Sequence, residues 1–156
     1  MIKIVSPKIE EYELISKFLI KIFNKNVSHL YNEMGNHEFI NHVHPYKLYE
    51  RGIDITCYTQ FLLKIKEEIL GFMETRESSH ITLLFVKIEE QRKGYGKSLF
   101  LHAEEIAKST GFNFITLNSS PNSLEAYEKW GFLRESDENS INGIRYFQMR
   151  KRIERN

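Results

Sequence analysis

The sequence predicts an α+β fold, and three features of its residue pattern support that prediction. Apolar residues recur at three- and four-residue spacing in two separate segments, as in helices that pack one face on a core. Short runs rich in Val, Ile, Thr, Phe and Tyr lie between polar or glycine-containing breaks, as in strands. The length of 156 residues suits one hydrophobic core, so we expect residues 1–156 to form a single domain.

The first third of the chain is predicted to contain one strand followed by helices. The alternation that begins at Ile2 indicates a short strand, which ends at Pro7 because proline has no backbone N–H for a ladder. An apolar stripe on an otherwise charged segment predicts a helix over about Glu10–Phe23. A second helical pattern around Phe39 is broken or bent near Pro45.

Three strands are predicted in the middle of the chain. Residues 55–66 and 69–73 flank the polar pair Glu67-Glu68 and should form an antiparallel hairpin. The third strand, His80–Val86, is mostly apolar, which favours burial on both faces and a place with the hairpin at the centre of the sheet. Cys57 is the one cysteine and cannot form an internal disulfide. Because it lies in the first of these strands, we expect a buried structural thiol.

Helices and strands alternate in the last third of the chain. Glycine and proline positions delimit the predicted elements, which are a helix that ends near Gly111, a strand over 112–117, a short helix opened by Pro121 and ended by Gly131, and two strands near Phe132 and over 144–149 around an Asn142-Gly143 turn. The charged tail, residues 150–156, is expected to fray.

The formal net charge of +1 excludes partners that are gathered by a strong global field. Nucleic acid and membranes are therefore not expected as partners, and an anionic ligand must be held by local geometry. No segment resembles a signal peptide or a membrane span, so we expect a cytoplasmic protein. Four histidines show no recognised metal-ligand spacing, so we expect no metal and interpret them as surface or substrate-pocket residues: His29, His37, His42 and His44.

The segment Gln91–Ser98 holds the pattern that is most informative about chemistry. It joins the apolar strand to the start of a helix, where unpaired backbone amides and the helix dipole favour an anion. Gly94 and Gly96 would let the main chain approach a pyrophosphate closely, and three basic residues add cationic donors. The spacing is not that of a P-loop, which disfavours a nucleoside triphosphate site. An ordinary glycine turn into a helix is the alternative interpretation.

Two motifs follow one another in the second half of the chain. Gln91, Gly94 and Gly96 fill the pattern Gln/Arg-x-x-Gly-x-Gly/Ala. Asn118–Pro121 is then followed by Ala126–Phe132, which contains Tyr-Glu-Lys-x-Gly-Phe. In this order the motifs resemble the acetyl-CoA-binding motif and the C-terminal motif of the GNAT family of N-acetyltransferases, over about residues 69–149. The earlier helices are similar to that family only in pattern.

The resemblance implies a fold, a cofactor and an activity. The fold is a central mixed, mostly antiparallel twisted sheet flanked by helices, with a bulged strand whose backbone pairs with the pantetheine arm. The activity is transfer of the acetyl group of acetyl-CoA, as co-substrate, directly to a primary amine of a small molecule or protein. The residues that the resemblance places at acetyl-CoA are Leu84, Phe85, Val86, Gln91, Arg92, Lys93, Gly94, Tyr95, Gly96, Lys97, Ser98, Asn118 and Ser120.

The implied chemistry needs an acid, an oxyanion donor and a base. The resemblance makes Tyr127 the proton donor to the CoA sulfur and the amide of Val86 the oxyanion donor, although Tyr127 could instead be a core tyrosine. The third strand lacks a carboxylate where many relatives place one, so Glu74 and His80 are the candidate bases, acting directly or through water. Alternatively, Glu74 is a solvated edge carboxylate and the amine arrives neutral by desolvation.

Two further questions stay open in the sequence. The other functional hypothesis is a non-catalytic acyl-CoA-binding sensor or partner module, although the tyrosine at position 127 favours an enzyme. The segments expected to shape the acceptor pocket, residues 24–54 and 139–145, match no pattern that identifies the acceptor. Edge strands near the C-terminus could pair two subunits in a homodimer.

Overall fold

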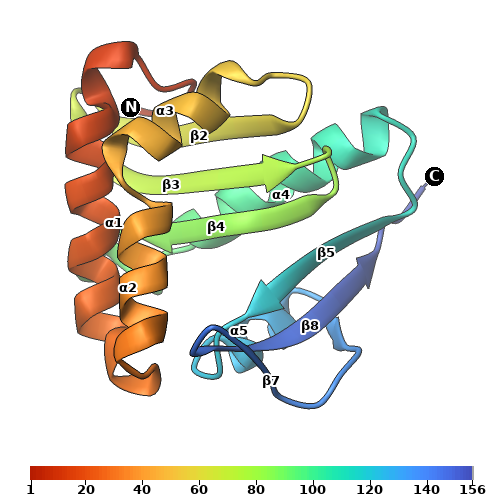
Figure 1. Ribbon diagram of the computed structural model, residues 1–156. Helices are drawn as coiled ribbons and strands as arrows, with labels where there is room; N and C mark the ends of the chain where they lie inside the picture. Colours follow the sequence, from red (N-terminus) through yellow and green to blue (C-terminus); the bar gives the residue numbers. More distant parts are fainter. Residues whose placement is uncertain (156) are drawn as a thin grey trace.

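The structure is a computed structural model that describes residues 1–155, and it has a central sheet with helices on both faces (Figure 1). The strands are β1 (Ile2–Val5), β2 (Tyr58–Ile65), β3 (Glu68–Arg76), β4 (His80–Val86), β5 (Phe114–Ser119), β6 (Leu133–Arg134), β7 (Asn139–Ile141) and β8 (Ile144–Arg152). The helices are α1 (Tyr12–Asn26), α2 (Glu33–His42), α3 (Pro45–Ile53), α4 (Tyr95–Ser109) and α5 (Leu124–Lys129), with 3-10 turns at Ile9–Glu11, Ser28–Leu30 and Ile88–Glu90. Within residues 1–155, no helix is long and apolar enough to cross a membrane.

The sheet is mixed, since β4 and β5 run parallel and the other paired strands run antiparallel. The strand order is β1-β2-β3-β4-β5-β8-β6, and β7 pairs with β8 off this path. The parallel pair joins only His80 with Thr116 and Ile81 with Leu117. Beyond these positions β4 and β5 diverge, and Figure 1 shows the gap widening toward α1 and α2. This arrangement confirms the mixed, mostly antiparallel sheet that the sequence predicts.

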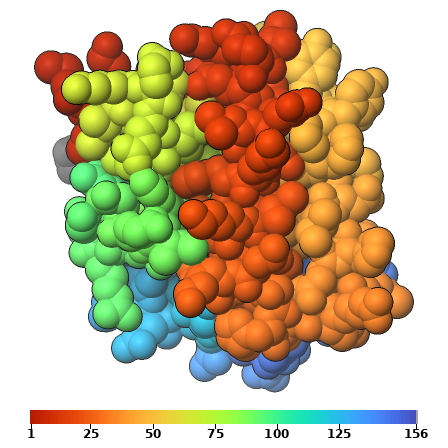
Figure 2. Space-filling model, turned by 90° about the vertical axis from the view of Figure 1, so that its left-hand side faces the viewer, coloured from red at the N-terminus to blue at the C-terminus, as the bar shows by residue number. Residues whose placement is uncertain are grey.

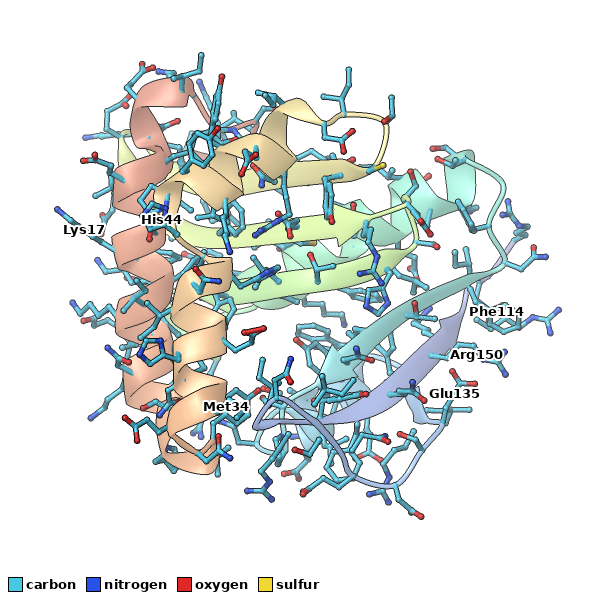
Figure 3. All side chains as sticks on the ribbon, viewed as in Figure 1. Lys17, Met34, His44, Phe114, Glu135 and Arg150 are labelled. Atoms are coloured by element: carbon cyan, nitrogen blue, oxygen red, sulfur yellow. The ribbon has the colours of Figure 1, made fainter. Side chains whose placement is uncertain are left out.

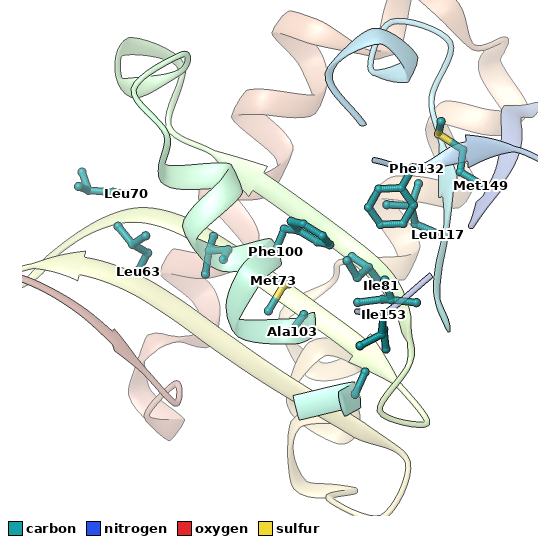
Figure 4. Close-up of a cluster of buried hydrophobic side chains, with 13 residues drawn as sticks. Leu63, Leu70, Met73, Ile81, Phe100, Ala103, Leu117, Phe132, Met149 and Ile153 are labelled. Atoms are coloured by element: carbon teal, nitrogen blue, oxygen red, sulfur yellow. The ribbon is translucent and has the colours of Figure 1, made fainter. Parts of the chain in front are cut away.

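Each face of the sheet carries its own hydrophobic core. Helices α1, α2 and α3 cover one face, where Leu19, Leu48 and Phe72 are buried together. Figure 2 shows α1 along this side of the molecule, with α2 and α3 on one flank. Helix α4 covers the opposite face, where Phe100 and Met73 belong to a second cluster (Figure 4). Because strand side chains alternate between faces, β3 and β4 contribute to both cores.

Most predicted elements are confirmed, and the differences lie at segment ends. Helix α1 confirms the predicted amphipathic helix, and Pro45 separates two helices because it is the first residue of α3. The β2–β3 hairpin is also confirmed. Pro121 does not open a helix, since α5 begins at Leu124. Strand β7, which the sequence pattern did not predict, pairs with β8 across the Asn142-Gly143 turn.

Two predictions about burial are wrong. Cys57 is exposed, because it lies in the turn before β2 begins at Tyr58. The tail does not fray where expected, because β8 continues to Arg152 and pairs with β5. Ile153 is 4% exposed and donates its N–H to the carbonyl of Asn113 at 2.8 Å. Asn156, the end of the predicted tail, lies outside the described residues.

Candidate active site

A cleft of about 1460 Å³ opens where β4 and β5 diverge. The apolar pattern of β4 predicts burial on both faces, and Ile81 and Leu83 are buried in the cores on opposite faces of the sheet. Leu84, Phe85 and Val86, further along the strand, are half-buried and line the cleft. The apolar run on β4 therefore contributes to both cores and, at its end, forms a wall of the cleft.

Helix α2 and the β7–β8 turn meet at one edge of this cleft. A Cβ atom placed on Gly35 would lie 2.2 Å from the carbonyl oxygen of Gly143, so a larger residue at position 35 would push the two segments apart. Figure 3 shows Met34 of α2 beside the same turn. Both segments contribute lining residues, including Phe39 and Asn142. The cleft is thus built from parts of the chain that lie about a hundred positions apart.

The backbone of β4 offers hydrogen-bonding groups to the cleft. Its pairing register with β3 shifts between Glu74 and Thr75, which places a bulge at Thr82. The N–H of Lys87 donates to Leu70 on the β3 side at 2.8 Å. Because alternate residues of an antiparallel strand direct their polar groups to opposite sides, Leu84 and Val86 direct theirs away from β3 and into the cleft. The Val86 carbonyl accepts a hydrogen bond from the Gln91 side chain at 3.0 Å.

The N-terminus of α4 supplies a second set of free amides. Gly94 precedes the helix with φ of 89°, a conformation that favours glycine. The N–H of Ser98 is the first that bonds within the helix, to Gly94, so the three preceding amides are free for a ligand. Gly96 is confined, since an added Cβ would lie 3.3 Å from the Trp130 ring. Arg92 also lines the cleft and adds positive charge at this end.

The structure brings most, but not all, of the predicted cofactor residues to the cleft. Those that line it are Leu84, Phe85, Val86, Gln91, Arg92, Gly94, Gly96, Lys97, Asn118 and Ser120. The side chains of Lys93, Tyr95 and Ser98 point elsewhere. Lys93 pairs with Glu90 at 2.8 Å, Tyr95 packs against the core under α4, and the Ser98 hydroxyl donates to Gly94. Tyr95 can therefore contribute its backbone amide but not its ring.

Tyr127 lines the cleft from α5, within a cluster of aromatic rings. Its ring packs edge-on against Trp130 and Phe132, with centroid separations of 5.3 and 5.9 Å. Tyr127 therefore lines the cleft and also packs against Phe132, as the alternative interpretation expects. Burial raises the pKa of the Tyr127 phenol to about 12, so the phenol keeps its proton at neutral pH and can donate it.

Glu74 lies beneath the cleft and not on its surface. Its side chain is 0% exposed and pairs with Arg51 at 2.9 Å, so the alternative of a solvated edge carboxylate is wrong. It accepts two bonds from Arg51 Nε, one from Gln60 at 2.8 Å and one from the Thr82 hydroxyl at 2.7 Å. These bonds fill the lone-pair positions of a carboxylate. Glu74 reaches the cleft only through Thr82, which lines it.

His80 lies where β4 and β5 are still paired, so it is not among the lining residues. Its Nδ1 is 2.8 Å from the hydroxyl of Thr116 on β5. Burial lowers the pKa of His80, and the positive charge of Arg76 lowers it further while Glu77 opposes the shift. Its position at the closed end of the strand pair explains why it does not face the cleft.

His42, at the end of α2, lines the cleft instead. The chain around it is held by Arg51, whose Nη1 donates to the His42 carbonyl at 3.0 Å. His42 is exposed along the cleft, yet the surrounding protein atoms desolvate its ring and lower its pKa. The positive charges of Arg51 and Lys47 lower this pKa further, and the negative charges of Glu74 and Glu38 oppose the shift. The sequence does not distinguish His42 from the three other histidines of residues 29–44, since no local pattern sets it apart. Residues 1–155 contain no group of three His, Cys, Asp or Glu side chains placed to hold a metal.

The cleft between β4 and β5 is suited to a ligand that bears phosphate groups. It contains the free amides at the start of α4 and the cations beside them. The chain belongs to the acetyltransferase (GNAT) domain family, whose model matches residues 27–153. It is 37% identical over 87 residues to the uncharacterized N-acetyltransferase YvbK of Bacillus subtilis, an alignment that covers 53% of this chain and 54% of that protein. The chain thus matches about half the length of this curated relative.

Solved structures share the whole fold. The PaiA N-acetyltransferase from Thermoplasma acidophilum in complex with coenzyme A has a TM-score of 0.83 and 22% identity, with 97% of this chain and 99% of that chain covered. Spermidine N-acetyltransferase from Vibrio cholerae in complex with CoA and spermine has a TM-score of 0.68 and 18% identity, with 97% and 95% covered. At these identities the likeness shows the GNAT fold.

The buried position of Glu74 generates a stability prediction. Glu74→Gln should lower the free energy of unfolding by about 3–5 kcal/mol, because the Arg51 charge is left buried without a counterion. Urea denaturation measures the loss. Glu138→Gln is the matched control, since Glu138 pairs with Arg145 at the surface and its loss should barely move the midpoint. Equal midpoints for the two variants would contradict the buried ion pair.

Proposed function

We propose that this protein is an acetyl-CoA-dependent N-acetyltransferase that moves the acetyl group directly to a primary amine. The observation that carries the proposal is the separation of β4 from β5 after two residue pairs, which opens one cleft to the β4 backbone, the α4 N-terminus and Tyr127. Membership in the acetyltransferase (GNAT) domain family supports it. The single domain over residues 1–156, the cytoplasmic location and the homodimer expected from the sequence stay predictions.

The residues present fit an acyl-CoA. The amides of residues 95–97 and the side chains of Arg92 and Lys97 would hold the pyrophosphate, since the helix start favours an anion. Glycine fits at position 96 because an added Cβ would lie 3.3 Å from Trp130 and 3.5 Å from Val86. The backbone of Leu84 and Val86 would pair with the pantetheine arm, and Asn118 and Ser120 would line its other side.

When bound, acetyl-CoA supplies an acetyl group activated as a thioester. The amine nitrogen forms a bond to the carbonyl carbon, and the bond from that carbon to sulfur breaks. The Val86 amide would stabilise the negative charge that develops on the carbonyl oxygen. Tyr127 holds a proton at its hydroxyl for the leaving sulfur, and its raised pKa keeps that proton in place until transfer.

A base must also accept the proton that the amine loses. Glu74 has its acceptor positions filled and His80 stands outside the cleft, so each could act only through an intervening group. We assign the role to His42, which lines the cleft and is neutral near pH 7 because its pKa is lowered. Glu74 then acts as a positioning residue, since it holds Arg51 and through it the His42 carbonyl.

Cofactor binding and turnover distinguish this proposal from the non-catalytic sensor. Calorimetry should detect acetyl-CoA binding to the unaltered protein and a Kd raised about tenfold by Lys97→Ala, because one charged contact to phosphate is lost. Lys93→Ala is the control, since the Lys93 side chain does not line the cleft and pairs with Glu90. Release of free thiol from acetyl-CoA in the presence of primary amines would support the enzyme. Binding without amine-dependent thiol release would favour the sensor, and no binding would refute both.

Tyr127→Phe should lower kcat by roughly 10²-fold or more, because the leaving sulfur loses its proton donor. The acetyl-CoA Kd should change little, since the ring and its aromatic contacts remain. Steady-state kinetics and calorimetry measure the two quantities. Tyr95→Phe is the matched control, because that hydroxyl lies outside the cleft and its kcat should be unchanged. An unchanged kcat for Tyr127→Phe would remove the acid role.

His42→Gln should lower kcat and remove the acidic limb of the pH profile. In the unaltered protein, activity should rise with pH through the pKa of His42, which lies below the ordinary value of 6.5, because the neutral ring is the base. The groups that set this pKa are Arg51, Lys47, Glu74 and Glu38. Rates measured at saturating substrate across pH 5–9 test the assignment, with His44→Gln as the control outside the cleft. Retention of the limb in His42→Gln would refute it.

A further inference from the structure

The cleft has a second side that the proposed cofactor contacts do not use. It lies on the face of the sheet under α1, α2 and α3, opposite α4. Phe72 belongs to the core on this face, and side chains alternate along β3, so Glu74 and Arg76 share it. Lys47, from α3, and Arg76 both line the cleft from this side. An acceptor that meets the thioester from the face opposite the cofactor would pass these two cations.

Three cations gather around Tyr58 at this corner. Tyr58 pairs with Arg76 across β2 and β3, and the Arg51 guanidinium carbon lies 5.9 Å from the centre of the Tyr58 ring. Lys47, Arg51 and Tyr58 also line a neighbouring cavity of about 360 Å³, which Glu50 and Asp54 border. Lys47 borders both spaces, so the cations form one cluster between the cleft and this cavity.

The positive charge of this cluster is incompletely neutralised. Glu74 pairs with Arg51 through Nε, but Arg51 Nη2 is buried without a hydrogen-bond partner among residues 1–155. Within the same range, neither Lys47 nor Arg76 forms an ion pair. Of the acidic residues that line the cleft, Glu38 lies on this side. Lys47 and Arg76, which both line the cleft, are therefore the cations on this side that a ligand in the cleft can reach.

We propose that the acceptor is a small amine that also carries a carboxylate or phosphate group, and that Lys47 and Arg76 bind that anionic group. The inference rests on the proposed acetyl transfer and narrows its acceptor. A polyamine would bring additional positive charge beside Lys47 and Arg76, where like charges repel. An anionic group at the same place gains charge-assisted hydrogen bonds and fixes the orientation of the amine toward the thioester.

Matched acceptor pairs test the proposal with the full chain. L-lysine differs from cadaverine by a carboxylate, and O-phosphoethanolamine differs from ethanolamine by a phosphate, so the two pairs also separate the two anionic groups. Spermidine represents the polyamines. We expect kcat/KM for the anionic member of at least one pair to exceed that of its counterpart by about tenfold or more, the value of one charge-assisted bond.

The double variant Lys47→Gln/Arg76→Gln locates the effect. Both side chains are exposed, so the fold should persist, and calorimetry with acetyl-CoA checks that the cofactor side is intact. The ratio of kcat/KM between the anionic acceptor and its counterpart should fall about tenfold, which a merely structural role would not produce. Lys21→Gln, at an exposed site on α1 away from the cleft, should leave the ratio unchanged.

Equal or higher kcat/KM for cadaverine, ethanolamine and spermidine would overturn the proposal. So would an unchanged ratio in the double variant when its acetyl-CoA Kd matches that of the unaltered protein. Acetyl transfer to none of the five acceptors, with acetyl-CoA binding intact, would contradict the proposed function itself and this inference with it. Selective loss of the anionic acceptor in the double variant alone supports the assignment.

Discussion

The early separation of β4 from β5 is the constraint on which the site depends. A full parallel ladder would satisfy the backbone of both strands, but here it ends after Ile81 and Leu117. The polar groups of Leu84 and Val86 are left facing the cleft, and Gln91 satisfies only the Val86 carbonyl. Backbone N–H groups require partners, so this gap favours a ligand that supplies carbonyl oxygens in the manner of a strand. The sheet thus leaves a place for one additional extended chain.

Packing behind the cleft keeps this gap open. Trp130 stacks on Phe100 at 5.4 Å and stands next to Gly96, while Phe132 packs on the same ring at 5.3 Å. Aromatic stacking of this kind adds about 0.5–1.5 kcal/mol per pair beyond burial, and it ties α4 to α5 at a fixed separation. The anion-binding start of α4 and the tyrosine of α5 are therefore held by one cluster. A change in either helix would move both.

The buried Glu74 holds several segments together on the other face of the sheet. It joins β3 to α3 through Arg51, to β2 through Gln60 and to the β4 bulge through Thr82. Gln60 accepts in turn from Tyr12 of α1 at 2.7 Å. A buried ion pair gives little net stability but is costly to break, which suits a device that holds several segments in one arrangement. The acceptor side is therefore rigid where Thr82 and Arg51 stand.

The sequence predicts those parts of the site whose residues lie close together along the chain. Gly94 and Gly96 are recognisable because a strand, a turn and a helix start follow one another within a few residues, and the cleft contains both. Glu74, His80 and His42 could not be distinguished, because their burial depends on where β2, α3 and β5 pack against them. The predicted burial of Cys57 is wrong because the strand begins at Tyr58 and not at residue 55, which leaves the cysteine in an exposed turn.

The formal net charge of +1 does not reveal where individual charges lie in the fold. Several acidic residues are engaged by basic partners on the surface, as in the pairs Glu138–Arg145 and Glu90–Lys93. Arg92 and Lys97 line one side of the cleft, and Lys47 and Arg76 the other. Fields from such cations are screened in solution over about 8 Å but much less within a cleft walled by protein. The proposed cofactor and acceptor would thus be attracted locally by these four cations, none of which forms an ion pair within residues 1–155, without an excess of net positive charge.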